Sequence, residues 1–571
     1  MLSRRSFLAT LLGSTALGGA AYAMAPAAAR PNIVTIVLDD VGYSDLGCFG
    51  GEIRTPNLDR LAAAGLRYAS FDTKAVCSST RAALLTGRNA HTVNMPDVPD
   101  TAPFAKPGDL PPGAFHLPNN AETVPEALRR EGYATWLVGK WHLIPKEQLD
   151  GISGQDTWPL QRGFDYFYGF ARGWTDQYRP DLVENNAYIK PQLPSGYHLS
   201  ADLIDKSMDL VERHLAEGKG RPFFLHIGLG AAHSPIQVPA SYSDRYKGVY
   251  DVGWDEIRRH RFARMKAIGL LPDHTVLPPA NEGDRAWAEL NEDERVVFAR
   301  FMEVYAGFLE HADEQIGRLL EHLKARGVDR DTMIVVLSDN GAASEAGQTG
   351  YFEALYRPNI LTAAQMRARL EELGTGKTQA EYPRPWAGAS VTPFRRYKLW
   401  PYLGGVRTPL IVSWPERIVD VGAIRRQYLD VVDVGPTLLA AAGTQFARAV
   451  GGVRQIPVAG RSFLPTLADP HAPAPRDTQY FELRGNRAIT SGRWRAVAMH
   501  ECGKPYEADR WQLFDTAADP SEARDLAAAE PAVLDRLKRL WSAEWARHVP
   551  APLQQPPAMI CAATKSYDAP V

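Results

Sequence analysis

Short apolar runs alternate along this chain with segments of helical periodicity, and this alternation constrains the fold more than any other feature. It is typical of an α/β sheet with helices on both faces. A chain of 571 residues, 45% of them hydrophobic, is long enough for one large domain of this kind and a smaller one. The clearest predicted strands are residues 33–38, 134–138, 222–228, 333–337 and 410–413.

Polar residues directly follow the first four of these strands. In chain order they are Asp39 and Asp40, then Lys140 and His142, then His233, then Asp339 and Asn340. Ligands of open α/β sheets bind outside the carboxyl ends of the strands. We therefore expect these side chains to converge on one cleft.

The two acidic pairs in this set can hold a metal ion. Asp39 and Asp40 leave one strand, and Asp339 and Asn340 leave a distant one, so oxygen ligands would come from two loops. All-oxygen ligation favours calcium or magnesium over zinc. An isolated carboxylate pair after a strand is more often a helix cap or a turn, but the two pairs together favour a metal site.

The segments between the strands predict helices and two long irregular stretches. Residues 291–326 place apolar side chains on one face of a helix that Gly327 closes, which we interpret as core packing. Residues 149–200 and 342–392 are rich in Gly, Pro and aromatic residues. Loops of this length are usually functional or disordered, and we expect these to wall the substrate pocket with Trp174, Tyr178 and Trp386.

The pattern changes near Arg476 to short alternating runs followed by a final helical segment. This predicts a small antiparallel sheet with one helix. We therefore expect a catalytic domain at residues 30–475 and a C-terminal subdomain at residues 476–571. No internal repeat is evident.

The first residues predict export from the cytoplasm. SRRSFLA, at residues 3–9, matches a twin-arginine signal, and the apolar run behind it is too short to span a bilayer. Small residues offer cleavage after Ala23 or Ala29, so we assign the signal to residues 1–29. The twin-arginine translocase would then carry the folded protein to the periplasm or out of the cell. A chance arginine pair is the alternative.

Charge and cysteine content exclude other classes. The formal net charge of −2 gives no basic surface for nucleic acid, and no second apolar run is long enough for a membrane anchor. Four cysteines are too few for a disulfide scaffold: Cys48, Cys77, Cys502 and Cys561. The periplasm permits a bridge between Cys502 and Cys561, which sequence alone does not establish.

Residues 77–88, CSSTRAALLTGR, resemble the nucleophile motif of the sulfatases, CxPxR followed by a helix ending in TGR. In that family the cysteine is oxidised to formylglycine before folding. The opening PNIVTIVLDDVGYSDLGCFG and the segments GYATWLVGKWHL, GFDYFYGF, SDNGA, GGVRTPLIVSWP and DPSEARDLA recur in the family's order. The chain thus resembles bacterial arylsulfatases of the alkaline phosphatase superfamily over nearly its whole mature length.

The resemblance implies a fold and a set of site residues. The fold would be an alkaline phosphatase-like, large mixed and mostly parallel sheet with helices on both faces, followed by a smaller α+β lobe. The positions that match calcium ligands of the family, where Mg²⁺ is the alternative ion, are Asp39, Asp40, Asp339, Asn340 and the modified Cys77. Arg81 matches the arginine that holds the formylglycine, and the polar groups around the sulfate are Lys140, His142, His233 and Lys398.

Chemistry gives each of these residues a role in the hydrolysis of sulfate monoesters to an alcohol or phenol. Hydrated formylglycine carries two hydroxyls, one to attack sulfur and one to expel sulfate afterwards. Arg81 and the cation would stabilise the charge that develops, and the two lysines would hold the sulfuryl oxygens. His233 is the candidate acid for the leaving group and His142 the candidate base for sulfate release.

Each assignment has a structural alternative. Lys140 can be a surface lysine, His142 a buried histidine, and Arg81 the partner of an acid at the start of its helix. His233 precedes Ser-Pro and can simply shape a turn. Lys398 lies among Arg395, Arg396 and Arg407, so its assignment depends most on the resemblance.

Ser79 departs from the family motif, which has proline, or sometimes alanine, at this position. Proline restricts itself and its predecessor to extended conformations, which suits a peptide bound by the formylglycine-generating enzyme, and serine lacks this preorganisation. We expect slower or partial conversion, or a modifying enzyme that tolerates serine. Two alternative functions follow: a phosphonate or phosphate ester hydrolase of the same superfamily, or an unmodified, inactive protein that binds a sulfated ligand.

Overall fold

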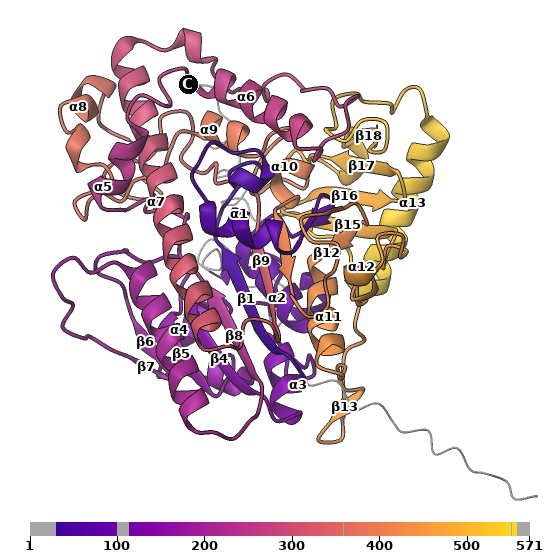
Figure 1. The fold of residues 1–571 in the computed structure, drawn as a ribbon. Coiled ribbons are helices and arrows are strands. Elements are labelled where there is room, and N and C mark those ends of the chain that lie inside the picture. The colour runs from indigo at the N-terminus through magenta and orange to yellow at the C-terminus, as the bar shows by residue number, and fades with distance from the viewer. Residues whose placement is uncertain (1–29, 100–113, 358, 550, 557–571) are drawn as a thin grey trace, which may run out of the picture. The chain divides into compact units, whose positions relative to one another are not determined.

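The apolar runs form a ten-stranded mixed sheet in the computed structural model, which describes residues 30–99, 114–357, 359–549 and 551–556 (Figure 1). The strand order is β11-β2-β10-β9-β1-β8-β4-β5-β6-β7. Their bounds are β1 (Asn32–Leu38), β2 (Leu66–Tyr68), β4 (Ala134–Lys140), β5 (Tyr166–Phe170), β6 (Val183–Glu184), β7 (Ala187–Tyr188), β8 (Phe223–Gly228), β9 (Thr332–Ser338), β10 (Leu410–Ser413) and β11 (Ile424–Arg425).

The centre of the sheet is parallel. β9, β1, β8, β4 and β5 all run in the same direction, whereas β10 and β6 are antiparallel to their neighbours. The prediction of a large, mixed and mostly parallel sheet is confirmed. Two further pairs lie outside it: β3 (Phe71–Asp72) with β12 (Leu429–Asp430), and β13 (Ala449–Val450) with β14 (Val453–Arg454).

Helices cover both faces of the sheet, as Figure 1 shows. The α-helices of the described residues are α1 (Pro56–Ala63), α2 (Cys77–Thr86), α3 (Val124–Arg130), α4 (Leu199–Ala216), α5 (Ala240–Ser243), α6 (Trp254–Ala267), α7 (Glu292–Ala325), α8 (Ala363–Arg367), α9 (Arg384–Ser390), α10 (Leu403–Val406), α11 (Val434–Ala441), α12 (Pro465–Ala468) and α13 (Pro531–His548).

Successive side chains of the buried strands point to opposite faces of the sheet and so pack against different helices. In β1, Val34 and Ile36 belong to the core cluster that includes residues of α1, α4 and α7. Ile33 and Val37 point the other way, into the cluster that includes residues of α2, α3 and α11. Successive side chains of a strand point to opposite faces, so one apolar strand supplies both cores.

The predicted long helix is α7, and its bounds agree with the sequence signals. The Asn291 side chain accepts a hydrogen bond from the backbone amide of Glu294, whose carboxylate accepts one from the amide of Asn291. This capping box satisfies amides that the first helical turn leaves free. Gly327, with φ of 68°, follows the helix end in the left-handed conformation that glycine adopts readily.

The C-terminal segment forms the predicted antiparallel sheet and helix. The sheet comprises β15 (Thr478–Leu483), β16 (Asn486–Ser491), β17 (Trp494–Ala498) and β18 (Trp511–Asp515). Leu537 and Trp541 of α13 pack on its apolar face against Ala496 and Leu513. This pairing buries the second, smaller core.

Some sequence predictions concern residues that the structure does not describe. The twin-arginine signal and its cleavage sites lie outside the described residues, as does Cys561. Cys502 is disulfide-bonded, and Cys48 and Cys77 are free thiols. None of the described helices is long and apolar enough to cross a membrane.

Candidate active site

The register of β1 and β9 brings the two acidic pairs together. Leu38 is the partner of Ser338 in this parallel pair, and the Asp339 amide donates to the Leu38 carbonyl at 3.1 Å. The chain after each strand therefore emerges at the same edge of the sheet. There the amide Nδ2 of Asn340 donates to Asp40 Oδ1 at 2.6 Å.

Unpaired oxygens and clustered carboxylates fit a hard cation at this edge. Asp39 Oδ1 and Asn340 Oδ1 are buried and have no hydrogen-bond partner among the described residues. Ligand atoms of Asp39, Cys77 and Asp339 all lie within 4.8 Å of one another. Burial, and then the Asp339 carboxylate, raise the pKa of Asp39 well above its ordinary value. A divalent cation would pair the free oxygens and relieve this repulsion.

Helix α2 presents Cys77 to the same cluster. Cys77 is the first residue of the helix and is 2% exposed, with its Sγ 3.2 Å from His142 Nδ1. Burial raises the pKa of its thiol, so an unmodified Cys77 is neutral and a poor nucleophile. The helix is followed by Gly87, whose φ of 62° lies in the left-handed region that glycine adopts readily.

Arg81 joins the nucleophile helix to the acidic cluster. It lies one turn after Cys77, and its Nε and Nη2 donate to Asp339 Oδ2 at 3.1 and 2.7 Å. Its Nη1 also donates to the Lys140 carbonyl at 3.3 Å. The alternative that Arg81 pairs with an acid is correct, but this acid belongs to the site.

Two lysines lie against the first acidic pair. Lys140 Nζ is 2.6 Å from Asp39 Oδ2, and Lys398 Nζ is 2.9 Å from Asp40 Oδ2. Burial lowers the pKa of each lysine, but these carboxylates outweigh it and raise the pKa, so both side chains stay cationic. Lys140 is therefore buried in the cluster and is not a surface lysine.

His233 faces Lys398 and Asp40 from the loop after β8. Its Nε2 is 3.5 Å from both Lys398 Nζ and Asp40 Oδ2, and its Nδ1 lies 2.6 Å from the Ser234 carbonyl oxygen. Burial, with a further contribution from Lys398, lowers the pKa of His233 to about 4. The side chain is therefore neutral near pH 7 in the absence of a bound anion.

Sequence reasoning missed two buried glutamates behind these groups. Glu345 Oε1 lies 2.8 Å from Lys398 Nζ, which it shares with Asp40. Glu381 accepts a hydrogen bond from the Ser234 hydroxyl at 2.9 Å, and burial and Glu345 raise its pKa to about 8. Both lie in the stretch predicted to be irregular, where no periodicity or motif distinguishes them from surface acids.

The prediction for Trp386 was wrong. Trp386 belongs to α9, is completely buried, and donates its indole N–H to the Phe298 carbonyl at 2.8 Å. It stabilises the core beneath the loop and cannot stack on a substrate. Trp174 is half-buried and packs against a small apolar cluster that contains Tyr351 and Leu355.

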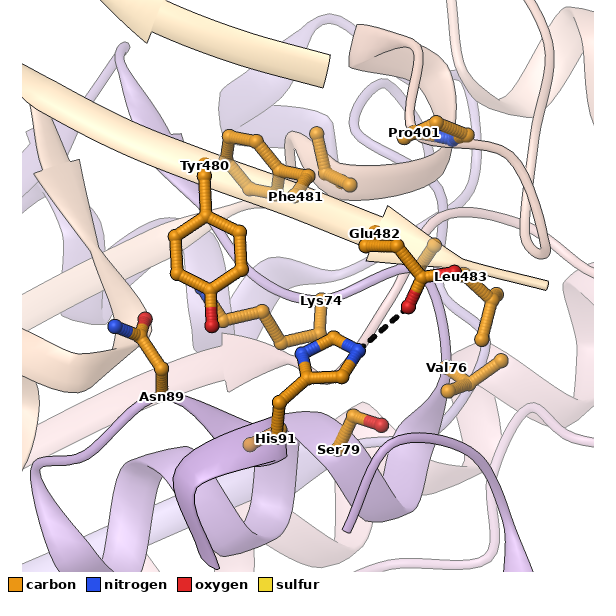
Figure 2. A pocket seen from close by; sticks show the side chains of 13 residues that line it. Lys74, Val76, Ser79, Asn89, His91, Pro401, Tyr480, Phe481, Glu482 and Leu483 are labelled. Carbon is orange, nitrogen blue, oxygen red and sulfur yellow. Dashed lines mark hydrogen bonds and ion pairs between the residues drawn. The ribbon is translucent and has the colours of Figure 1, made fainter. Parts of the chain in front are cut away.

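Ser79 is the third residue of α2, and its hydroxyl donates to the Met95 carbonyl at 2.8 Å. It lines a cavity of about 20 Å³ beneath β15 (Figure 2). In this cavity His91, in the short helix that follows α2, and Glu482 of β15 form a hydrogen bond of 2.7 Å. Position 79 lies in the first turn of the helix, where backbone amides have no intrahelical acceptor, so the helix does not need an amide donor there.

Comparisons with known proteins agree with this geometry. The family model described as Sulfatase matches residues 31–444, and the one described as N-sulphoglucosamine sulphohydrolase, C-terminal, matches residues 396–542. An uncharacterized sulfatase of Schizosaccharomyces pombe is 32% identical over 90% of this chain and 93% of its own length. The arylsulfatase of Klebsiella aerogenes is 32% identical over 80% of this chain and 95% of its own.

A solved structure shows the same fold at lower identity. The crystal structure of Ps i-CgsB in complex with k-i-k-neocarrahexaose has a TM-score of 0.62 and 22% identity, and the match covers 95% of this chain and 98% of that one. Together with the family model and the relatives of similar length, this establishes that the chain is a hydrolase of the sulfatase family.

Proposed function

We propose that this enzyme hydrolyses sulfate monoesters to an alcohol or phenol and sulfate, using a formylglycine derived from Cys77 and a divalent cation. The observation that carries the proposal is the meeting of Cys77, Arg81 and two buried acidic pairs at one edge of the sheet. The buried oxygens that lack partners support the cation. We expect Ca²⁺, with Mg²⁺ as the alternative, held by Asp39, Asp40, Asp339, Asn340 and the modified Cys77.

The cation, the formylglycine and the side chains around them have separate roles in the reaction. When present, the cation supplies positive charge beside the sulfuryl group, and formylglycine supplies two hydroxyls on one carbon. Arg81, held by two hydrogen bonds to Asp339, places its guanidinium beside the modified residue. Lys140 and Lys398 bind sulfuryl oxygens, because both are cationic and lie on the same acidic pair.

The two histidines move protons in this proposal. His233 protonates the leaving oxygen, and the anionic ester favours its protonated form although its pKa is about 4 in the free site. His142 accepts a proton when sulfate is expelled, since its Nδ1 lies 3.2 Å from the atom that oxidation of Cys77 replaces.

Maturation and location belong to the same proposal. A formylglycine-generating enzyme converts Cys77, and the twin-arginine translocase exports the folded protein to the periplasm or beyond. Residues 30–475 form the catalytic domain, and residues 476–571 form the C-terminal subdomain. Residues 480–483 of this subdomain line the cavity next to Ser79.

Matched esters test the activity. We expect kcat/KM for 4-nitrophenyl sulfate to exceed that for 4-nitrophenyl phosphate and for a phenylphosphonate monoester, measured on one preparation with added Ca²⁺. The Cys77→Ala variant is the control, because it keeps the Asp and Asn metal ligands but has no group to oxidise. A clear preference for either phosphorus ester would contradict the proposal and favour the related hydrolase.

A further inference from the structure

Tyr356 has an unusual backbone conformation beside the active site. Its φ is 57°, in the left-handed region that bulky side chains rarely adopt, and the residue is 48% exposed. Backbone strain of this kind persists where the surrounding structure holds it, and it is concentrated at functional sites.

Tyr356 contacts a neighbouring ring that is tied to the floor of the site. Its ring centroid lies 6.2 Å from that of Tyr351, at an angle of 64°. Tyr351 exchanges two backbone hydrogen bonds with Glu381, of 2.9 and 3.0 Å, and its hydroxyl donates to the Glu345 carbonyl at 2.7 Å. Because Glu381 also holds Ser234, beside His233, the tyrosine pair is fixed relative to the candidate proton donor.

The phenol group of Tyr356 lies among the charges of the site. It interacts electrostatically with Lys398, Glu345, Glu381 and Asp40. A tyrosine hydroxyl ordinarily titrates at about pH 10, so it is protonated at neutral pH and can donate a hydrogen bond. No hydrogen bond to this hydroxyl occurs among the described residues, which leaves it available to a ligand bound next to Lys398.

We propose that Tyr356 determines specificity for a leaving group that carries a ring beside the ester oxygen. The exposed face of Tyr356 stacks on that ring, and its hydroxyl donates to an oxygen of the ester. Trp174 packs against the apolar cluster that contains Tyr351, the residue that Tyr356 contacts. The inference rests on the proposed function, because the ester must bind with its sulfate at Lys398. Both an aryl group and a pyranose have a ring face on which Tyr356 can stack.

A series of esters tests the proposal on the full-length, matured enzyme. The substrates are 4-nitrophenyl sulfate, glucose 6-sulfate and hexyl sulfate, and the variants are Tyr356→Ala and Tyr356→Phe. We expect Tyr356→Ala to lower the ratio of kcat/KM for a ring ester to that for hexyl sulfate by about tenfold, mainly through KM, because the stacking is made in the bound ground state as well. Tyr356→Phe should retain most of the ratio.

The pattern across substrates decides the outcome. A loss confined to the aryl ester or to the sugar ester supports the proposal and identifies the source of the ring. An equal loss for hexyl sulfate, or no loss for any ester, would overturn it. Tyr356→Gly separates specificity from a structural role: glycine adopts this φ without strain, so we expect an unchanged or higher Tm together with the loss of ring selectivity. A lower Tm would indicate a structural role instead.

Failure of the proposed function gives a different result. A wild-type enzyme that turns over none of the esters would refute the hydrolase proposal. Calorimetric binding of 4-nitrophenyl sulfate and hexyl sulfate to wild type and Tyr356→Ala then tests the inference alone. The inference is supported if the wild type binds the two esters with different affinities and Tyr356→Ala binds them with equal affinity. It is overturned if the substitution leaves both affinities unchanged.

Discussion

Replacing Ser79 by proline, the family residue, should raise conversion of Cys77 while changing the stability of the folded protein little. The substitution removes the hydrogen bond from the Ser79 hydroxyl to the Met95 carbonyl, a net loss of about 1 kcal/mol. Proline also restricts the unfolded chain, which stabilises by about 0.4–1 kcal/mol where the native φ is compatible. As the third residue of α2, position 79 has such a φ and needs no amide donor.

The remaining cost is crowding of Ser78, which precedes the proline and must stay helical. The opposing contributions leave a net destabilisation of at most about 2 kcal/mol. In the unfolded peptide the same ring favours the extended conformation that a modifying enzyme binds. Proline therefore acts mainly before folding.

The assay measures the converted fraction by mass spectrometry of the Cys77 peptide, and stability by urea unfolding. Ser79→Ala is the matched control, because it loses the same hydrogen bond without gaining the restraint. We expect more conversion in Ser79→Pro than in Ser79→Ala, with activity per converted molecule equal in both. Equal conversion in the two variants, or a loss of stability above about 3 kcal/mol, would refute the reasoning.

Three further predictions concern the metal, the Lys398 environment and acid stability. Ca²⁺ at about 100 times its Kd should stabilise the protein by about 2.7 kcal/mol, seen as a higher Tm that Asp39→Asn abolishes; no Tm response would argue against a cation site. Glu345→Gln leaves Lys398 with one carboxylate partner, so kcat/KM for a sulfate ester should fall about tenfold, with partial recovery in Glu345→Asp; unchanged kinetics would show that Glu345 is dispensable. Burial lowers the pKa of His198 to about 4 and of His311 to about 2, below the unfolded value of about 6.5. Their contribution to the free energy of unfolding is therefore complete above about pH 6.5 and is lost as the pH falls, by about 2 kcal/mol each at pH 5. His311→Phe should reduce the slope of unfolding free energy against pH between 5 and 6.5, and an identical slope would contradict the assignment.

The buried strands were the most predictable part of the fold. Residues 33–38, 134–138, 222–228, 333–337 and 410–413 agree with β1, β4, β8, β9 and β10 to within two residues at either end. Long apolar runs make a strong local signal because both faces of a central strand are buried. The antiparallel direction of β10 has no local signal, because strand direction depends on which distant strand it pairs with.

Errors arose where tertiary contacts decide the outcome. Trp386 lies in a Pro- and Gly-rich stretch that favours a loop, yet seven residues there form α9 and enter the core. The short β5 was absent from the predicted strands because its segment was assigned to an irregular stretch.

The residues that resemble the family motif were easier to place than their partners. Asp39, Asp339 and Cys77 were named from motifs, and the structure brings them within one cluster. Glu345 contacts Lys398 although 52 residues lie between them in the sequence, and no local pattern marks that contact. Burial and distance, which only the folded chain supplies, distinguish such a residue from a solvated acid.

Mass spectrometry of the peptide spanning residues 75–81, from protein of the native host, tests the central claim most directly. The account predicts that Cys77 carries an aldehyde in place of its thiol, and that sulfate ester hydrolysis scales with the converted fraction across preparations. An unaltered thiol in a preparation that hydrolyses sulfate esters would contradict it. An unaltered thiol in an inactive preparation would instead favour a protein that binds a sulfated ligand without turnover.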